Sequence, residues 1–375
     1  MFITFVDIDG YKNLKEVFFE PHKKYNLITG KNAQGKTNLL EAIWIMTGCR
    51  SFRGSKDRDY IALDRKFMNA RIDFAGGRRL QKIDYILSRD NIRDKKISIN
   101  GIKLKGTREL FESFKCVVFT PDDIDLINEG PEKRRNFIDM CCCQIAPSSL
   151  GYIRKYEILL AQRNAALKEI AAGRGDETAL DVWNRQMSVI GTRICNMRKR
   201  YTARLDKICR ELYGKITSGA EELSITYCSN IFGSDEEIDI HTAASVDKYY
   251  ERLCRCQKDD IRLGFTTQGA NRDDISIKIN GLSIRDYGSQ GQKKSAALVL
   301  KLGQADIYYK NIEEAPVILL DDVMGELDES RQELVFDIVK DMQVFITTCN
   351  ENSVKMLSSG KHFVMEEGRL SERKC

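Results

Sequence analysis

The chain has 375 residues, of which 42% are apolar and 31% are charged, and its formal net charge is +5. This composition predicts one large globular domain or two ordinary ones, and the weak charge excess places any nucleic-acid binding in local patches. No apolar run in the sequence approaches the roughly 20 residues that span a bilayer, and acids stand where a signal peptide carries basic residues. We therefore expect a cytoplasmic protein with no membrane segment.

The twelve cysteines form no paired CxxC spacing, and the three histidines lie far apart in the sequence. This usage predicts reduced thiols, not a disulfide framework or a zinc site. Cys141, Cys142 and Cys143 are consecutive, and we expect them to be small buried residues of a packed helix.

The first part of the chain predicts strands within residues 1–29, then a glycine-bounded loop, then a helix over 39–46. Gly76-Gly77 and Asn100-Gly101 indicate β-hairpins, and Asn280-Gly281 gives the same signal late in the chain.

The middle of the chain permits long helices because residues 148–315 contain no proline. Apolar residues step by three and four from Leu180 to Leu212, which predicts an amphipathic helix roughly 50 Å long. Similar spacing from Ile153 to Ile170 predicts a partner helix just upstream. We therefore expect an antiparallel, coiled-coil-like arm that interrupts an α/β domain whose halves lie at the two ends of the chain.

Residues 30–37 match the nucleotide-binding pattern G-x-x-x-x-G-K-[ST] in full, between an apolar strand and a helix. The backbone N–H groups of such a loop wrap phosphates, Lys36 reaches the β- and γ-phosphates, and the Thr37 hydroxyl ligates Mg²⁺. The alternative is a glycine loop that matches by accident, which the flanking strand and helix disfavour. The predicted ATP-binding residues are Gly30, Lys31, Asn32, Ala33, Gln34, Gly35, Lys36, Thr37 and Asn38.

A second carboxylate site follows the apolar run Val317–Leu320. Asp321 is positioned to hold Mg²⁺, and Asp322 stands where a general base polarises the attacking water. Taken alone, the pair also fits a surface turn after a core strand. Together with the P-loop it indicates a metal site at Thr37 and Asp321, with Lys36 and Asp322 as catalytic residues.

A third motif, Ser289-Gln290-Gly291-Gln292, opens a predicted helix. Serine and glycine at a helix N-terminus direct N–H groups and a hydroxyl outward, which favours an anion. In isolation an ordinary helix cap is the better explanation. The motif stands between the P-loop and the acidic strand, however, where ABC-type ATPases keep their signature motif, and this position indicates a contact with ATP.

Together these motifs resemble the RecF family of DNA replication and repair ATPases, in the SMC-like branch of the ABC ATPases. The resemblance rests also on Ser51-Phe52-Arg53, Pro131-Glu132-Lys133-Arg134-Arg135 and Gln162-Arg163-Asn164, and it covers nearly the whole chain. It implies an α/β ATPase head built from residues 1–125 and 263–375, with an inserted, mainly helical domain at 126–262.

The resemblance further implies ATP-dependent head-to-head dimerisation, in which the signature motif of one subunit touches the γ-phosphate held by the other and Asp328 belongs to the D-loop. It implies binding to DNA at single-strand gaps and duplex junctions. RecO and RecR are the implied partners, in loading RecA onto single strands coated by SSB and in the SOS response.

The sequence also departs from related patterns. Asp322 stands where most ABC ATPases have glutamate, although RecF relatives share the Asp-Asp pair, and its shorter side chain predicts slow hydrolysis. The resemblance implies a weak ATPase that DNA stimulates. Thr348 replaces the usual switch histidine. Residues 268–271 depart from the Gly-Pro-His text typical of RecF, which leaves any role of a family histidine there in doubt.

Two basic clusters are candidate DNA contacts, because cations on phosphates bind without reading sequence. The cluster on the arm consists of Arg193, Arg198, Lys199, Arg200 and Arg204, with Lys207 beside them. The cluster after the first helix consists of Arg50, Arg53, Lys56 and Arg58. A solvated helix face explains the arm cluster equally well.

Other classes of function stay open on the sequence. A P-loop kinase needs an acceptor-binding lid and leaves the arm unexplained, and an SMC-like ATPase coupled to a nuclease needs a further acidic metal cluster. The cytosolic subunit of an ABC transporter keeps a Leu-Ser-Gly-Gly signature and has no arm. We therefore favour an ATP-gated, DNA-binding clamp.

Overall fold

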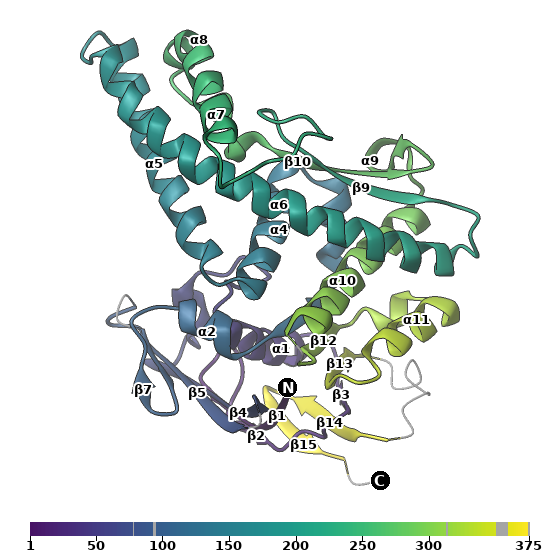
Figure 1. Ribbon diagram of the computed structural model, residues 1–375. Helices are drawn as coiled ribbons and strands as arrows, with labels where there is room; N and C mark the ends of the chain where they lie inside the picture. Colours follow the sequence, from purple (N-terminus) through teal and green to yellow (C-terminus); the bar gives the residue numbers. More distant parts are fainter. Residues whose placement is uncertain (78, 93–94, 313, 350–358, 374–375) are drawn as a thin grey trace. The chain divides into compact units, whose positions relative to one another are not determined.

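The computed structural model describes residues 1–77, 79–92, 95–312, 314–349 and 359–373, and Figure 1 draws its helices and strands. The chain divides into a head unit, Met1–Ile124 with Ala297–Cys375, and an arm unit, Asp125–Ala296. The predicted head built from both ends of the chain is thereby confirmed. These ends are purple and yellow in Figure 1.

One sheet of the head unit carries the strands that lead to the predicted nucleotide site, in the order β15-β14-β3-β13-β12-β8. Its strands are β3 (Tyr25–Thr29), β8 (Cys116–Phe119), β12 (Val317–Asp321), β13 (Val344–Thr348), β14 (Lys361–Glu366) and β15 (Arg369–Glu372). Every residue of β8, β12 and β13 is buried, which explains why these strands are mainly apolar. Because β3, β13 and β12 are parallel, their carboxyl ends meet at one edge of the sheet.

The second sheet of the head unit is antiparallel, in the order β2-β1-β4-β5-β6-β7. Its strands are β1 (Phe2–Asp9), β2 (Val17–Phe19), β4 (Phe67–Gly76), β5 (Arg79–Ser88), β6 (Lys96–Ile99) and β7 (Ile102–Lys103). Both predicted hairpins are confirmed: β4 pairs with β5, and β6 pairs with β7. Asn100 and Gly101 adopt φ of 53° and 81°, as a two-residue hairpin turn of this hand requires.

The helices that lie wholly in the head unit are short. They are α1 (Lys36–Trp44) with the 3₁₀ turn Ile45–Thr47, the 3₁₀ turns Asp57–Tyr60, Pro121–Ile124 and Met324–Glu326, α2 (Arg108–Ser113) and α11 (Glu329–Val339). The helix predicted over 39–46 is confirmed and begins at the P-loop lysine. The boundary between the units falls inside α10 (Gln290–Ile312).

The arm unit contains the long helices that the sequence predicts. Its helices are α3 (Asp125–Asn128), α4 (Pro131–Ile145), α5 (Ser149–Ala171), α6 (Leu180–Ile216), α7 (Ala243–Arg255), α8 (Gln257–Leu263) and α9 (Ile284–Tyr287), with 3₁₀ turns at Glu177–Ala179 and Ala270–Arg272. Helices α5 and α6 pack on each other, and α6 buries Met187, Ile194 and Leu205 along one stripe (Figure 1). The predicted amphipathic pair is confirmed.

The structure moves the second domain boundary away from the predicted residue 262. Strand β10 (Asp274–Ile279) pairs along its whole length with β9 (Leu223–Cys228), and β11 (Leu282–Ser283) joins it through a turn at Asn280-Gly281. Residues 263–296 therefore belong to the arm unit, because β10 finds its hydrogen-bonding partner there. The arm unit consequently contains a three-stranded sheet beside its helices.

The three consecutive cysteines lie in a packed helix, as predicted. Cys141, Cys142 and Cys143 are buried in α4, and the described cysteines are free thiols. Among the described residues no group of histidine, cysteine or acidic side chains has the arrangement of a metal cluster. No helix formed by these residues is long and apolar enough to cross a membrane.

Candidate functional site

The P-loop stands between β3 and α1, as the motif requires, and its backbone takes conformations that glycine favours. Gly30 and Gly35 have φ of 148° and 116°, and Ala33 is also left-handed at 63°. A Cβ atom on Gly30 would lie 2.3 Å from the carbonyl oxygen of Met365. The loop therefore passes β14 too closely for any larger residue at position 30.

The loop is held in shape by its neighbours in the head unit. The N–H of Gly368 donates to the Gln34 carbonyl at 3.0 Å, and the N–H of Glu367 donates to the Gln34 side chain at 2.6 Å. Asn13 donates to the Ala33 carbonyl at 3.2 Å and accepts from Asn38 at 2.7 Å. These bonds preorganise the phosphate-binding turn. Sequence reasoning missed Asn13, which matches no motif.

Lys36 is 7% exposed, and its ammonium group donates only to neutral acceptors among the described residues. Its Nζ lies 2.7 Å from the Gly30 carbonyl and 2.9 Å from the Lys31 carbonyl. The third acceptor is the Cys349 thiol at 3.3 Å. A phosphate oxygen can replace such acceptors and supply the missing negative charge.

Cys349 follows directly on the buried Thr348 that ends β13. Its thiol also contacts the Asn32 side-chain oxygen at 2.8 Å. Sequence reasoning passed over Cys349, although the residue that follows a strand end of the parallel sheet is a natural neighbour of the P-loop.

The predicted metal ligands lie together, with Thr37 in the first turn of α1 and Asp321 at the carboxyl end of β12. The Thr37 hydroxyl donates to Asp321 Oδ1 at 3.0 Å, and the Thr347 hydroxyl donates to the same oxygen at 2.7 Å. Asp321 is 6% exposed. Burial raises the pKa of Asp321, while the hydrogen bonds from Thr347 and Thr37 oppose that rise. A divalent cation next to Thr37 and Asp321 stabilises such a desolvated carboxylate, so this oxygen donor set fits Mg²⁺.

Asp322 differs from its neighbour in both exposure and backbone conformation. Its side chain is exposed, and its φ of 55° lies in the left-handed region, which aspartate tolerates better than most residues. Its N–H donates to the carbonyl and to the hydroxyl of Thr347, at 3.1 Å each. The strand therefore ends with one buried and one accessible carboxylate.

The signature motif lies in the arm unit and forms a capping box at the start of α10. The Gln292 N–H donates to the Ser289 hydroxyl at 3.2 Å, and the Ser289 N–H donates to the Gln292 side chain at 2.8 Å. Ser289, Gln290 and Gly291 are exposed, and Gln292 is half-buried. Asp328, predicted as the D-loop aspartate, caps α11 by accepting from the Arg331 N–H at 2.9 Å.

The basic loop after α1 exposes all four of its predicted DNA contacts, Arg50, Arg53, Lys56 and Arg58. Its scaffold is Glu41, a fully buried acid of α1 that pairs with Lys12 and accepts a hydrogen bond from the Ser51 hydroxyl. Sequence reasoning missed Glu41, although a lone acid inside an apolar helix is a detectable signal. Arg53 also donates to Asn38 at 3.1 Å, which ties this loop to the P-loop helix.

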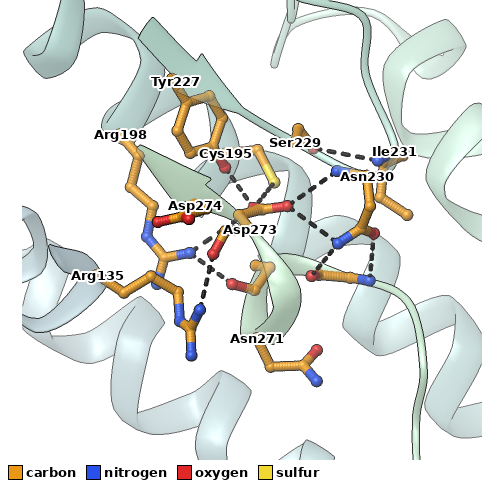
Figure 2. Close-up of polar contacts among 12 residues, drawn as sticks. Arg135, Cys195, Arg198, Tyr227, Ser229, Asn230, Ile231, Asn271, Asp273 and Asp274 are labelled. Atoms are coloured by element: carbon orange, nitrogen blue, oxygen red, sulfur yellow. Dashed lines mark hydrogen bonds and ion pairs between the residues drawn. The ribbon is translucent and has the colours of Figure 1, made fainter. Parts of the chain in front are cut away.

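The prediction that Arg198 is a DNA contact is wrong, because its guanidinium is committed to partners inside the arm unit. Figure 2 shows it in a buried polar network around Asp273. Arg198 is 6% exposed and forms two hydrogen bonds of 2.8 Å to Asp139. It also donates to the Ala270 carbonyl at 2.5 Å and lies 3.7 Å from Asp273.

The same network lies next to residues 268–271, whose sequence departs from the one typical of RecF. The Asp273 carboxylate accepts from the Tyr227 hydroxyl and the Cys195 thiol, and Arg135 donates to the Asp273 carbonyl at 2.7 Å (Figure 2). Asn271 accepts from the Tyr156 hydroxyl at 3.0 Å. The polar environment of this turn is thus satisfied without a histidine.

The remaining arm candidates differ in accessibility. Arg193, Arg200, Arg204 and Lys207 are exposed, and their spacing places them along one face of α6. Arg193 stacks on Tyr152 with 5.2 Å between its guanidinium carbon and the ring centroid. Lys199 donates to the carbonyls of Ser234 at 2.6 Å and Glu236 at 2.5 Å. We call the four exposed cations the basic stripe.

Comparisons with known proteins agree with this arrangement. The model of the RecF/RecN/SMC N terminal domain matches residues 2–372. The chain is 33% identical over 374 residues to the DNA replication and repair protein RecF of Acetivibrio thermocellus, covering 98% of this chain and 99% of the relative. It is 34% identical over 347 residues to RecF of Clostridioides difficile, covering 92% and 91%.

Solved structures show the same likeness. The recombination mediator protein RecF-ATP in the RecFOR pathway matches with a TM-score of 0.90 and 33% identity, over 100% of this chain and 98% of that one. An SmcHead bound to the C-winged helix domain of ScpA matches with a TM-score of 0.57 and 16% identity, over 100% and 97%, which supports the fold alone.

Proposed function

This chain belongs to the RecF family of DNA replication and repair proteins, and from that premise we propose that it is an ATP-gated clamp on DNA. ATP drives two heads together, and slow hydrolysis releases them. The observation that carries the proposal is the hydrogen bond from Thr37 to Asp321 beside a preformed P-loop.

The residues of the head unit fit ATP and Mg²⁺. The loop N–H groups and Lys36 are suited to the phosphates, and Thr37 and Asp321 are suited to the metal ion. When bound, the ion supplies charge neutralisation on the β- and γ-phosphate oxygens. Asp322, which is exposed beside these groups, orients or deprotonates the attacking water.

Dimerisation assigns a role to the signature motif. Its exposed serine directly precedes α10 and its exposed glycine lies in the first turn of that helix, whose N-terminus attracts anions, so both are suited to the γ-phosphate bound by a second copy of the chain. ATP then bridges two subunits, and the complex opens when the γ-phosphate is lost. This makes hydrolysis, which we expect to be weak and DNA-stimulated, a switch.

The DNA ligand and the protein partners follow from the family. We propose that the dimer binds gapped DNA at duplex junctions without reading sequence, and that it acts with RecO and RecR to load RecA where SSB coats the single strand. The basic loop and the basic stripe are the candidate phosphate contacts. A solved relative described as a recombination mediator in the RecFOR pathway supports this assignment.

Sedimentation velocity of the full chain, with and without ATP and duplex DNA, tests the proposal. We expect the wild-type chain to dimerise in ATP, and DNA to favour the dimer further. Ser289→Arg is expected to keep ATP binding by the monomer and to abolish the dimer, because the added side chain fills the phosphate position of the facing subunit. A dimer that forms equally well with Ser289→Arg contradicts the signature assignment.

A further inference from the structure

The signature motif is fixed from two sides within the arm unit. Its capping box closes the turn locally, as described above. In addition, the amide nitrogen of Gln292 donates to Glu221 Oε1 at 2.7 Å, across 71 residues of sequence. Gln292 therefore uses its side-chain oxygen to hold Ser289 and its side-chain nitrogen to hold a distant carboxylate.

Glu221 lies in the short connection between α6 and β9 and has a partner for each carboxylate oxygen. Its Oε2 accepts from the hydroxyl of Tyr213, a 1% exposed residue in the last turns of α6, at 2.8 Å. The carboxylate is thereby held between the end of the long helix and the signature motif.

Hydrogen bonds also fix the backbone around Glu221, and this limits the positions that its carboxylate can take. The Thr217 hydroxyl donates to the Glu221 carbonyl at 3.4 Å. The next residue, Glu222, donates its N–H to the Asn280 side chain at 2.8 Å and accepts from the Asn280 N–H at 2.9 Å. Asn280 belongs to the turn between β10 and β11, the hairpin that leads to the signature motif.

We propose that Glu221 is a positioning residue that sets the geometry of the signature motif from the end of α6, an inference that rests on the proposed function. The Ser289 hydroxyl accepts from the Gln292 N–H, so its own proton stays available for a phosphate oxygen. Glu221 orients the side chain of Gln292, and the oxygen of that side chain holds the N–H of Ser289, so the backbone from which the hydroxyl projects is fixed. A carboxylate acceptor makes this a charge-assisted bond, which is stronger than a neutral one.

The proposal is tested by comparing Glu221→Ala with Glu221→Gln and with Glu222→Ala. The alanine variant loses both side-chain bonds, whereas the glutamine variant keeps an oxygen for Gln292 and an amide that donates to the Tyr213 oxygen. Glu222→Ala is the matched control, because it removes the neighbouring exposed carboxylate, which pairs with Arg210 and does not touch the signature motif in the described structure.

In sedimentation of the full chain with ATPγS, we expect Glu221→Ala to raise the dimer dissociation constant about tenfold or more. Glu221→Gln and Glu222→Ala are expected to stay close to wild type. The affinity of each monomer for a fluorescent ATP analogue, measured at low protein concentration, is expected to be unchanged. A structural role alone predicts instead a lowered unfolding midpoint with an unaltered dimer.

A second measurement does not depend on dimerisation. Without nucleotide, hydrogen exchange at the N–H groups of Ser289 and Gln292 is expected to speed up in Glu221→Ala and not in Glu222→Ala. Equal dimers and equal exchange in Glu221→Ala and wild type overturn the inference. A wild-type chain that stays monomeric in ATP overturns the proposed clamp, and the exchange result then decides the positioning by itself.

Discussion

The arm unit pairs its buried arginines with carboxylates, whereas the head unit leaves a buried lysine and a buried aspartate facing neutral groups. Arg163 lies 2.7 Å from Asp260, with both side chains fully buried. Lys36 and Asp321, by contrast, have no ion-pair partner among the described residues. A ligand that brings phosphates and a metal ion supplies both missing charges.

The partners of a buried charge indicate whether it serves the fold or a ligand. A buried ion pair whose two charges already neutralise each other contributes to a specific fold, and neither charge is available to bind a ligand. A buried charge whose counter-charge is absent is expensive to maintain, and such groups gather at functional sites. Arg198 and Lys36 are almost equally buried, and only their partners distinguish them.

We expect the largest effect when one partner of a buried ion pair is removed. Arg198→Ala leaves Asp139 and the buried Asp273 without their cation, and we expect the free energy of unfolding to fall by about 3–5 kcal/mol. Urea denaturation followed by circular dichroism measures this loss. Arg200→Ala, two positions along the same helix and exposed, is the matched control and should stay within about 0.5 kcal/mol of wild type. Similar losses in the two variants would contradict the comparison.

The next largest effect is expected in the head unit and concerns the rate of ATP hydrolysis. Lys36→Arg is expected to keep some ATP binding and lower hydrolysis by about 10²–10³-fold, because a planar guanidinium does not reproduce the compact ammonium at the β- and γ-phosphates. Phosphate release at saturating ATP measures it. The control is Lys24→Arg, which changes an exposed side chain just before β3, at the other end of that strand from the P-loop, and should leave the rate unaltered. Wild-type turnover in Lys36→Arg refutes the P-loop assignment.

The sequence was sufficient for features whose geometry is local. The P-loop was predictable because Gly30, Lys36 and Thr37 stand in one short segment between a strand and a helix. Helix α6 was predictable because its apolar period continues without a break from Leu180 to Leu212. In both cases the signal lies within one continuous stretch of sequence.

The features that the sequence did not predict depend on partners far along the chain. Arg198 looks like any exposed arginine until Asp139 and Asp273 are seen beside it. The boundary at 262 failed because the partner of β10 is β9, which precedes it by more than a helix. The contact of Glu221 with Gln292 is likewise invisible in either segment alone.

Asp322→Asn tests the exposed carboxylate that stands next to the buried Asp321. Asparagine fits the left-handed backbone and is nearly isosteric, so Thr37 and Asp321 should still hold Mg²⁺. Only the handling of the attacking water is lost, and the closed clamp should leave duplex DNA about tenfold more slowly in ATP. In ADP it should leave as fast as wild type. Equal off-rates in ATP mean that hydrolysis through Asp322 does not control release.

The smallest effect concerns exposed charges on the helix that also carries Arg198. Arg200→Ala with Lys207→Ala removes two cations of the basic stripe, and for every phosphate that is no longer neutralised the slope of log affinity against log salt falls by about 0.9. We therefore expect DNA binding to weaken a few-fold and to become less sensitive to salt, with unchanged stability. Arg255→Ala, an exposed arginine of α7 paired with Glu251, is the control. An unchanged slope makes the stripe an ordinary solvated face. The basic loop of the head unit, in which Arg53 bonds to Asn38 of the P-loop helix, is then the remaining candidate.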